Sequence, residues 1–203
     1  MNKNLLNLNL YYIKNLLKTS KMLQKNTKTQ HLLYKVVIVG DGGVGKSTMV
    51  QRLLTGLYLE QKITIGTDLA TCDFEIDENT TAMLQIWDFA GEKRFRFFLP
   101  NYARGASGCL LCYDITRHTS FDNLIEWYNI IKDNAVDPVF ILVGGKHDLA
   151  DQRRSVEFVE AIEFKNKYNI AHIFETSSKS GLNNNIIFET LTKAIIEKRK
   201  GII

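Results

Sequence analysis

Proline and cysteine are scarce in this chain of 203 residues, which has two prolines and three cysteines. Because the prolines stand alone at Pro100 and Pro138, no proline-rich linker divides the chain into domains. An odd number of cysteines without an apparent signal peptide argues against a disulfide framework and predicts a reducing environment. The hydrophobic fraction of 45% is enough for one globular domain with a buried core.

Long apolar runs and a strong overall charge are also missing. No stretch reaches the roughly 18 uninterrupted apolar residues that cross a bilayer, so we expect no membrane-spanning segment. Acidic residues are absent from residues 1–31, which hold six lysines and carry +6. The chain's net charge of +4 then leaves 4 − 6 = −2 for the rest. A nearly neutral body without a basic stripe predicts no nucleic-acid partner.

Two of the cysteines, Cys109 and Cys112, have the CxxC spacing of a metal or redox pair. They lie in the apolar run GCLLCYDI, which predicts a strand. Side chains alternate between the two faces of a strand, so residues three apart point in opposite directions. We therefore expect two separate, buried structural cysteines.

Short apolar runs alternate with helical periods from about Leu33 onward, which predicts an α/β fold with a three-layer, doubly wound sheet. The segments 68–77 and 81–88 alternate polar and apolar residues around a DENT turn and predict an antiparallel hairpin. The sheet should therefore have six strands, mostly parallel with one antiparallel strand, and about five helices. Expected strands cover 34–40, 68–77, 81–88, 108–116, 139–145 and 171–177, and expected helices cover 45–55, 119–134, 155–168 and 182–199.

A phosphate-binding loop is predicted by GDGGVGKS, Gly40 to Ser47, which matches G-x-x-x-x-G-K-[ST] between an expected strand and helix. The glycines let backbone N–H groups surround a phosphate, and the helix amino terminus favours its negative charge. Lys46 would bind the β- and γ-phosphates, and the Ser47 hydroxyl suits Mg²⁺. The alternative is a glycine-rich turn with a solvent-exposed lysine. The predicted contacts of this loop are Gly42, Gly43, Val44, Gly45, Lys46, Ser47 and Thr48.

Two further segments can complete a site for a nucleoside triphosphate. Asp88 ends an expected strand and can hold Mg²⁺ through water, while Gly91 lets its own N–H approach a γ-phosphate. Thr64 can offer a hydroxyl to the metal and an N–H to the γ-phosphate. Alone it would be an ordinary loop threonine, but beside the other parts it is a candidate switch residue.

At these positions the sequence resembles the Ras-superfamily small GTPases, and most of all the Rab branch. TIGTD is similar to the Rab segment TIGVDF, LQIWDFAGEKRFR to LQIWDTAGQERFR, YARGA to YYRGA, and ETSSK to ETSAK. The resemblance runs from about Leu33 to Arg199. It implies a cytoplasmic molecular switch of the P-loop fold that binds GTP or GDP with Mg²⁺ and hydrolyses GTP slowly. It also implies effectors, GTPase-activating proteins and exchange factors as partners, and a role in membrane trafficking.

The resemblance also assigns a guanine site. Lys146 and Asp148 match the NKxD motif of the family, in which Asp accepts hydrogen bonds from guanine N1 and N2 and the Lys stem covers the base. The N–H groups of Ser177 and Ser178 would donate to the guanine oxygen, with Lys179 over the other face. An adenine amino group facing those donors would cost about 1 to 3 kcal/mol, so GTP is favoured over ATP.

The chain departs from the family pattern at two positions. Gly145 replaces an Asn that ties the base-reading loop to the phosphate loop, and losing hydrogen bonds of about 0.5 to 1.5 kcal/mol each predicts weaker nucleotide retention. Glu92 replaces the Gln that orients the attacking water. Its carboxylate can still accept a hydrogen bond from water, but the γ-phosphate repels it, and these two effects oppose each other. Lys62 stands near Thr64, so no internal arginine finger is visible, and Gly42 leaves room for a partner's.

Aromatic residues near the switches have two assignments. Tyr58 would shield the guanine edge, although Leu57 aligns equally well and a surface tyrosine is an alternative. Leu69, Trp87 and Tyr102 match the positions of the Rab effector-binding set, with Leu in place of Phe. They predict a partner surface, unless Trp87 is simply a half-buried sheet residue.

The domain organisation predicted is an N-terminal extension over residues 1–31 and a small GTPase domain over residues 32–203. In residues 5–28, apolar side chains form one helical stripe and lysines lie opposite, as in helices on anionic membrane surfaces. A disordered extension and a true start near Met22 are the alternatives. EKRKGII offers no cysteine for prenylation, so a peripheral membrane position would depend on that extension.

Two other functions share some of these features. A pseudo-GTPase scaffold that binds nucleotide weakly is supported only by Gly145 and Glu92. A nucleotide kinase would share the phosphate loop but needs an arginine-bearing lid, which the sequence does not contain.

Overall fold

The computed structural model describes residues 30–59 and 63–201. They form one six-stranded sheet in the order β2-β3-β1-β4-β5-β6, in which only β2 is antiparallel to its neighbour. This confirms the predicted fold class. The strands are β1 (Gln30–Val39), β2 (Thr67–Asp77), β3 (Thr80–Phe89), β4 (Gly108–Asp114), β5 (Val139–Gly145) and β6 (His172–Glu175).

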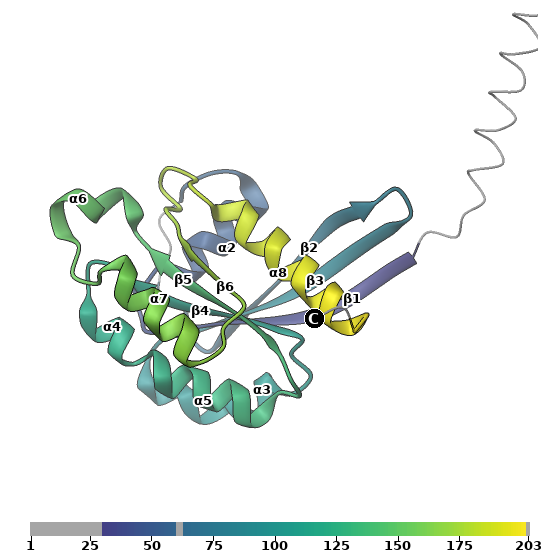
Figure 1. Cartoon of the computed structure of the whole chain (residues 1–203), viewed down its shortest axis with the longest axis horizontal. Helices are drawn as coiled ribbons and strands as arrows, with labels where there is room; N and C mark the ends of the chain where they lie inside the picture. Colours follow the sequence, from purple (N-terminus) through teal and green to yellow (C-terminus); the bar gives the residue numbers. More distant parts are fainter. Residues whose placement is uncertain (1–29, 60–62, 202–203) are drawn as a thin grey trace, which may run out of the picture.

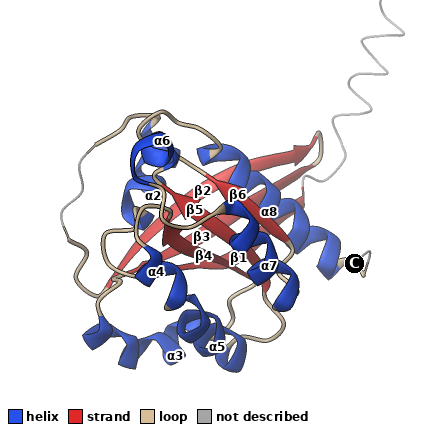
Figure 2. Cartoon of the chain, turned by 60° about the vertical axis from the view of Figure 1, so that its left-hand side comes forward, coloured by secondary structure: helices blue, strands red, loops and turns tan. Residues whose placement is uncertain are grey.

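Helices cover both faces of this sheet (Figure 1, Figure 2). They are α2 (Lys46–Thr55), α3 (Leu99–Ala103), α4 (His118–Asp122), α5 (Leu124–Asn134), α6 (Ala150–Arg153), α7 (Phe158–Lys167) and α8 (Asn184–Arg199), with 3₁₀ helices η1 (Lys93–Phe98) and η2 (His147–Leu149). Residues of α2 and α8 pack on one face, and residues of α3, α5 and α7 pack on the other, so the domain has three layers.

Several predicted boundaries were wrong because local contacts end or divide an element. The strand expected over 108–116 ends at Asp114, whose carboxylate accepts hydrogen bonds from the N–H and hydroxyl of Thr116 at 2.9 and 2.7 Å and turns the chain. The helix expected over 119–134 is divided into α4 and α5 at Asn123. The short helices α3 and α6 were not predicted, since neither is long enough to show a helical period.

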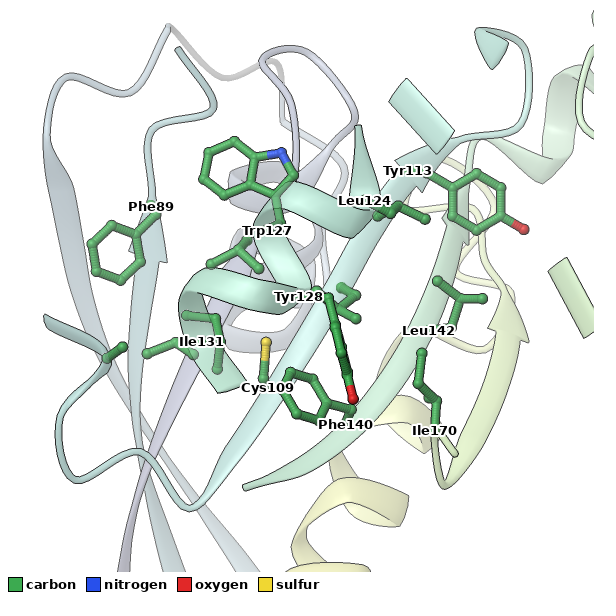
Figure 3. Close-up of a cluster of buried hydrophobic side chains, with 14 of the residues drawn as sticks. Phe89, Cys109, Tyr113, Leu124, Trp127, Tyr128, Ile131, Phe140, Leu142 and Ile170 are labelled. Carbon is green, nitrogen blue, oxygen red and sulfur yellow. The ribbon is translucent and has the colours of Figure 1, made fainter. Parts of the chain in front are cut away.

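The core fills the space on both sides of β4, which is buried at every position. Figure 3 shows α5 placing Trp127, Tyr128 and Ile131 against this strand and β5. Cys109 packs in this cluster, whereas Cys112 packs in the opposite one, under α2 and α8. The prediction of two separate buried cysteines is confirmed, and burial raises the pKa of the Cys112 thiol to about 12.

The amino-terminal end of the described chain already belongs to the sheet. β1 begins at Gln30, two residues before the predicted domain boundary, and pairs there with Thr80 of β3. The amphipathic pattern of residues 5–28 lies outside the described residues. Within the described ranges, no helix combines the length and apolarity needed to cross a membrane.

Five strand ends converge to make one edge of the sheet. β1, β3, β4, β5 and β6 run parallel, so their carboxyl ends share that edge. Ligands of such sheets bind beyond these ends. Every segment for which the sequence predicts a ligand contact follows one of these strands or lies beside α2.

Candidate nucleotide-binding site

The phosphate loop connects β1 to α2 with a backbone that only glycine tolerates at two points. Gly40 has a φ of 141°, and a Cβ there would lie 2.0 Å from the Cys112 carbonyl oxygen. Gly45 has a φ of 105° and caps α2, where it accepts the N–H of Met49 at 2.9 Å. L side chains are strained at both φ values, and at Gly40 the absence of a side chain also lets the loop pack against β4.

Lys46 is the most buried charged side chain of this loop, with 6% of its surface exposed. Its ammonium donates to the carbonyl oxygens of Gly40 at 2.7 Å and Asp41 at 2.9 Å. Burial lowers the pKa of this ammonium, while the charge of Asp88 opposes that change. A glycine-rich turn with a solvent-exposed lysine is therefore not what the chain forms.

Three oxygen-bearing side chains meet beside Lys46. The Ser47 hydroxyl lies 2.7 Å from the Thr64 hydroxyl and donates a hydrogen bond to Asp88. Asp88 is 3% exposed, and burial raises the pKa of its carboxyl to about 6. Its second oxygen, Oδ1, is buried without a hydrogen-bond partner among the described residues.

This oxygen cluster fits a magnesium ion. Mg²⁺ prefers hard oxygen ligands and is usually held by one or two protein groups, with phosphates and water completing its shell. One carboxylate with an unpaired oxygen and two hydroxyls supply that kind of donor set. Across the described ranges no group of three or more His, Cys, Asp or Glu side chains gathers as a metal site.

The loop after β3 contacts the phosphate loop directly. A Cβ on Gly91 would lie 2.1 Å from the Gly42 nitrogen, and that nitrogen donates to the Gly91 carbonyl at 3.1 Å. Glu92 follows and pairs with Arg94 at 2.7 Å, where both side chains are more than a third exposed. Glu92 therefore lies at the mouth of the phosphate region with its charge partly offset by an exposed arginine.

Two adjoining cavities follow this edge of the sheet. A cavity of about 500 Å³ includes Gly42, Ser47, Thr64, Gly91 and Glu92 in its lining. A second cavity of about 230 Å³ continues toward the ends of β5 and β6. They share the lining residues Gly45, Lys46, Thr48, Tyr58 and Lys146. The second cavity is also lined by Val44, Asp148, Ser178 and Lys179.

The base-reading residues are placed together, with one correction. Ser177 is 0% exposed, and its N–H donates to the Leu182 carbonyl at 3.2 Å, so it does not point at a base as predicted. Its hydroxyl instead donates to Asp148 Oδ1 at 2.6 Å and fixes that carboxylate. Ser178 lines the cavity, and its predicted backbone contact with the base stays a prediction. Tyr58, rather than Leu57, lines both cavities.

Lys146 is positioned by Asp114, a residue for which the sequence predicted no role. Its φ is 67°, and its ammonium lies 2.6 Å from Asp114 Oδ2 at the end of β4. Burial acts to raise the pKa of Asp114, but the hydrogen bonds from Lys146 and Thr116 outweigh it and lower that pKa. An acidic residue at the end of a buried strand was the available sequence signal.

Gly145 packs directly on the phosphate loop. A Cβ there would lie 2.8 Å from the Val44 carbonyl oxygen and 3.4 Å from the Tyr113 carbonyl oxygen. The backbone of the phosphate loop at Val44 thus occupies the space that a side chain at position 145 would need. No side-chain hydrogen bond can join the two loops at this point, because glycine has none to offer.

The predicted partner surface also assembles. Leu69 of β2 stands directly opposite Trp87 of β3, and the Trp87 and Tyr102 rings are 5.4 Å apart between centroids. Leu69 is 55% exposed, whereas Trp87 is only half-buried and covered on part of its ring by Lys35. Trp87 is a partly buried sheet residue, and its part in a partner surface stays a prediction.

A partly buried polar network around Asp41 of the phosphate loop was not visible in the sequence. The Asp41 carboxylate accepts hydrogen bonds from Arg96 at 3.0 Å, Trp127 at 2.9 Å and Asn123 at 2.7 Å. Arg96 also pairs with Glu126 and lies over the Trp127 ring. Because Arg96, Asn123 and Trp127 are 55 to 86 positions from Asp41, no local sequence pattern predicts the network.

Comparison with known proteins assigns the chain to a protein family. The sequence model of the Ras family matches residues 35–197, which is most of the chain. The chain belongs to this family. It is 37% identical to Ras-related protein Rab-19 of Rattus norvegicus over 168 residues, which are 82% of this chain and 76% of that protein. It is 41% identical to GTP-binding protein ypt1 of Schizosaccharomyces pombe over 168 residues, 82% and 81% of the two chains.

A plant relative gives the same assignment. The Ras-related protein RABA1g of Arabidopsis thaliana is 41% identical over 164 residues, 79% of this chain and 74% of that protein. All three relatives carry Rab, Ypt or Rab-type names, so this Ras-family protein is Rab-like.

Proposed function

We propose that this Rab-like protein is a GTP-dependent molecular switch that acts in membrane trafficking. Proteins of its family are GTPases that bind GTP or GDP with Mg²⁺ and hydrolyse GTP to GDP, and this protein is one of them. The observation that supports the switch best is that Lys46, Ser47 and Thr64 line one cavity, which adjoins a second cavity lined by Asp148. Asp88 is joined to them by the hydrogen bond from Ser47.

The phosphate end works through charge and backbone. With nucleotide bound, Lys46 would exchange the carbonyls of Gly40 and Asp41 for β- and γ-phosphate oxygens, which pair better with its buried charge. Ser47 and Thr64, with Asp88 through water, would hold Mg²⁺, which would supply positive charge against the phosphates. The N–H of Gly91 and that of Thr64 would bind the γ-phosphate, so both segments are ordered by GTP and released after hydrolysis.

The base end selects guanine. The Ser177 hydroxyl donates to Asp148 Oδ1 at 2.6 Å and holds the carboxylate, which would accept hydrogen bonds from N1 and N2 of a guanine. The Ser178 N–H would donate to the guanine oxygen, and the stems of Lys146 and Lys179 would lie over the two faces. Adenine offers a donor where Ser178 donates, so we expect GTP to bind more tightly than ATP.

Nucleotide release is predicted to be fast because the base end is weakly tied to the phosphate end. Gly145 has no side chain to take the place of the asparagine, and the Val44 carbonyl oxygen lies 2.8 Å from where its Cβ would be. Opening of the two loops then breaks no side-chain hydrogen bond at this point. Glu92 would still orient the attacking water by accepting its hydrogen bond, with Arg94 reducing its repulsion of the γ-phosphate.

Regulators and effectors are the partners of such a switch. We infer that effectors bind at Leu69, Trp87 and Tyr102, the surface that joins β2 and β3 to α3 beside the two switch segments. A membrane contact through residues 5–28 rests on the sequence pattern alone. Liposome flotation of the full chain against a chain from residue 31 onward tests it, and equal recovery of both would reject it.

Identification of the bound nucleotide tests the main proposal. The full chain is purified, denatured, and its released nucleotide separated by ion-exchange chromatography. We expect GDP or GTP after purification in Mg²⁺ buffer, and slow release of phosphate from added GTP. Adenine nucleotide, or a chain that binds no guanine nucleotide at micromolar concentration, would reject the proposed function.

A further inference from the structure

Arg117 contacts the phosphate loop from the segment that follows β4. It lies between β4 and α4, and its Nη2 donates to the Gly42 carbonyl at 2.6 Å. Its Nη1 lies 4.0 Å from the position of a Cβ on Gly43. Near Thr64 the sequence has a lysine, Lys62, and no arginine. The described structure places one beside the glycines that hold phosphate.

The guanidinium of Arg117 lies beside the glycines of the phosphate loop. Arg117 also lines a cavity of about 190 Å³ together with Gly42 and Gly91. This cavity opens beside the segments assigned to the γ-phosphate.

The backbone of Arg117 is fixed while its side chain is exposed. Its N–H donates to the Asp114 carbonyl at 3.0 Å, and its carbonyl accepts the Ser120 hydroxyl at 2.7 Å. Within the described ranges, the guanidinium has no carboxylate partner, and the Gly42 carbonyl is its one hydrogen-bond acceptor. Four of its five donors are therefore available to an anion.

A second arginine at the same cavity shows the contrast. Arg96 pairs with Asp41 at 3.0 Å and with Glu126, and it stacks on Trp127 at 4.3 Å. Its charge is used inside the protein, and moving it would leave Asp41 without a partner. Of these two arginines, only Arg117 can turn toward a phosphate without breaking an ion pair.

We propose that Arg117 is an internal arginine for GTP hydrolysis, which turns from the Gly42 carbonyl to the β- and γ-phosphate oxygens when GTP is bound. This inference rests on the proposed function. In the reaction, the water oxygen forms a bond to the γ-phosphorus, and the bond from that phosphorus to the β–γ bridging oxygen breaks. The bonding electron pair passes to the β-phosphate of GDP, and the water protons go to the released phosphate and to solvent. A guanidinium at the bridging oxygen stabilises this developing charge.

The expected effect of Arg117 on the hydrolysis rate follows from the effect of arginine fingers in other GTPases. An arginine finger is worth on the order of 10³ or more in hydrolysis rate, and GTPases without one hydrolyse at about 10⁻⁴ per second. With Glu92 in place of the usual Gln, we expect a smaller gain here, an intrinsic rate at least about 10-fold above that of a chain without Arg117.

Single-turnover hydrolysis of preloaded GTP by the full chain tests this. We expect Arg117→Ala to lower the rate at least about 10-fold, and Arg117→Lys to restore part of it because the charge returns. Arg104→Ala is the matched control, since Arg104 is an exposed arginine before β4, at the opposite end of that strand. Equal rates for wild type and Arg117→Ala would overturn the inference.

A second measurement separates this role from simple support of the phosphate loop. GDP with aluminium fluoride and Mg²⁺ mimics the transferring phosphoryl group, and we expect the wild type to bind it without a partner protein. Arg117→Ala should lose this response while its affinity for GDP stays within about 2-fold. If Arg117→Ala lost GDP affinity as much as it lost the aluminium fluoride response, Arg117 would only support the phosphate loop. A wild type that binds no GTP would reject the proposed function itself and this inference with it.

Discussion

The two ends of the nucleotide site are built in different ways. The phosphate end is made of glycine backbone at close contact and two buried charged groups, Lys46 and Asp88. The base end is made of side chains that follow β5 and β6, and Gly145 gives it no side-chain connection to the phosphate loop. We infer that the phosphate end decides whether a nucleotide binds, and the base end decides which one and for how long.

The largest effect should come from the phosphate end. Lys46→Ala removes the buried ammonium, and we expect GTP affinity to fall about 100-fold or more, because charge-assisted hydrogen bonds to phosphate are among the strongest. Titration with a fluorescent GTP analogue measures this. Lys193→Ala, on the exposed side of α8, is the control. If both variants bound GTP equally well, the phosphate end would not dominate.

Asp148→Asn tests whether the base end selects the nucleotide. The change turns one acceptor into a donor, so we expect guanine affinity to fall about 10- to 100-fold, by about 1.5 to 3 kcal/mol. Xanthine, which carries an oxygen in place of the N2 amino group, should gain. Competition between GDP and xanthosine diphosphate measures this, with Asp151→Asn on α6 as the control. An unchanged preference would contradict the assignment of Asp148.

Asp88 makes the phosphate end depend on pH. Its carboxyl has a pKa of about 6 before cations bind, against an ordinary 3.8, because burial disfavours its charge. Mg²⁺ needs the carboxylate, so we expect Mg²⁺ to tighten GDP binding at pH 7.5 and to lose roughly 10-fold of that effect at pH 5. GDP titrations with and without Mg²⁺ at both pH values measure it, and Asp88→Asn should show no such difference.

The same shift affects the stability of the protein without nucleotide. The folded state holds the proton of Asp88 more tightly than the unfolded chain does, so its contribution is fully present below pH 3.8 and is lost as the pH rises through about 6. Thermal unfolding of nucleotide-free wild type and Asp88→Asn between pH 4 and 7 should diverge in that window. Parallel curves would contradict the raised pKa.

The smallest effect should come from the base end. Gly145→Asn offers the missing hydrogen bond, worth about 0.5 to 1.5 kcal/mol, so GDP release should slow about 2- to 10-fold. A Cβ must displace the Val44 carbonyl, which lies 2.8 Å away, so Gly145→Ala is the matched variant that carries this cost without the hydrogen bond. Release of a fluorescent GDP measures all three chains. Equal release from wild type and Gly145→Asn would show that Gly145 does not limit retention.

Much of the site could be predicted because its contacts follow strands directly in sequence. Gly40 to Ser47 form one contiguous loop, so a local motif specifies both its backbone and its chemistry. The antiparallel pair β2 and β3 was equally clear, since side-chain alternation and a turn report it locally. The predicted N–H contact of Ser177 was wrong for the opposite reason: this N–H donates to the Leu182 carbonyl in a turn that no residue type indicates.

The sequence by itself determined the layers, the phosphate loop and the family, because glycine spacing and hydrophobic period act over a few neighbouring residues. The tertiary structure decided which distant side chains meet at the edge of the sheet. Arg117 reaches Gly42 across 75 positions, and Asn123 reaches Asp41 across 82. Periodicity reports which side of a strand is buried, but only the packing of strands in one order brings their ends together.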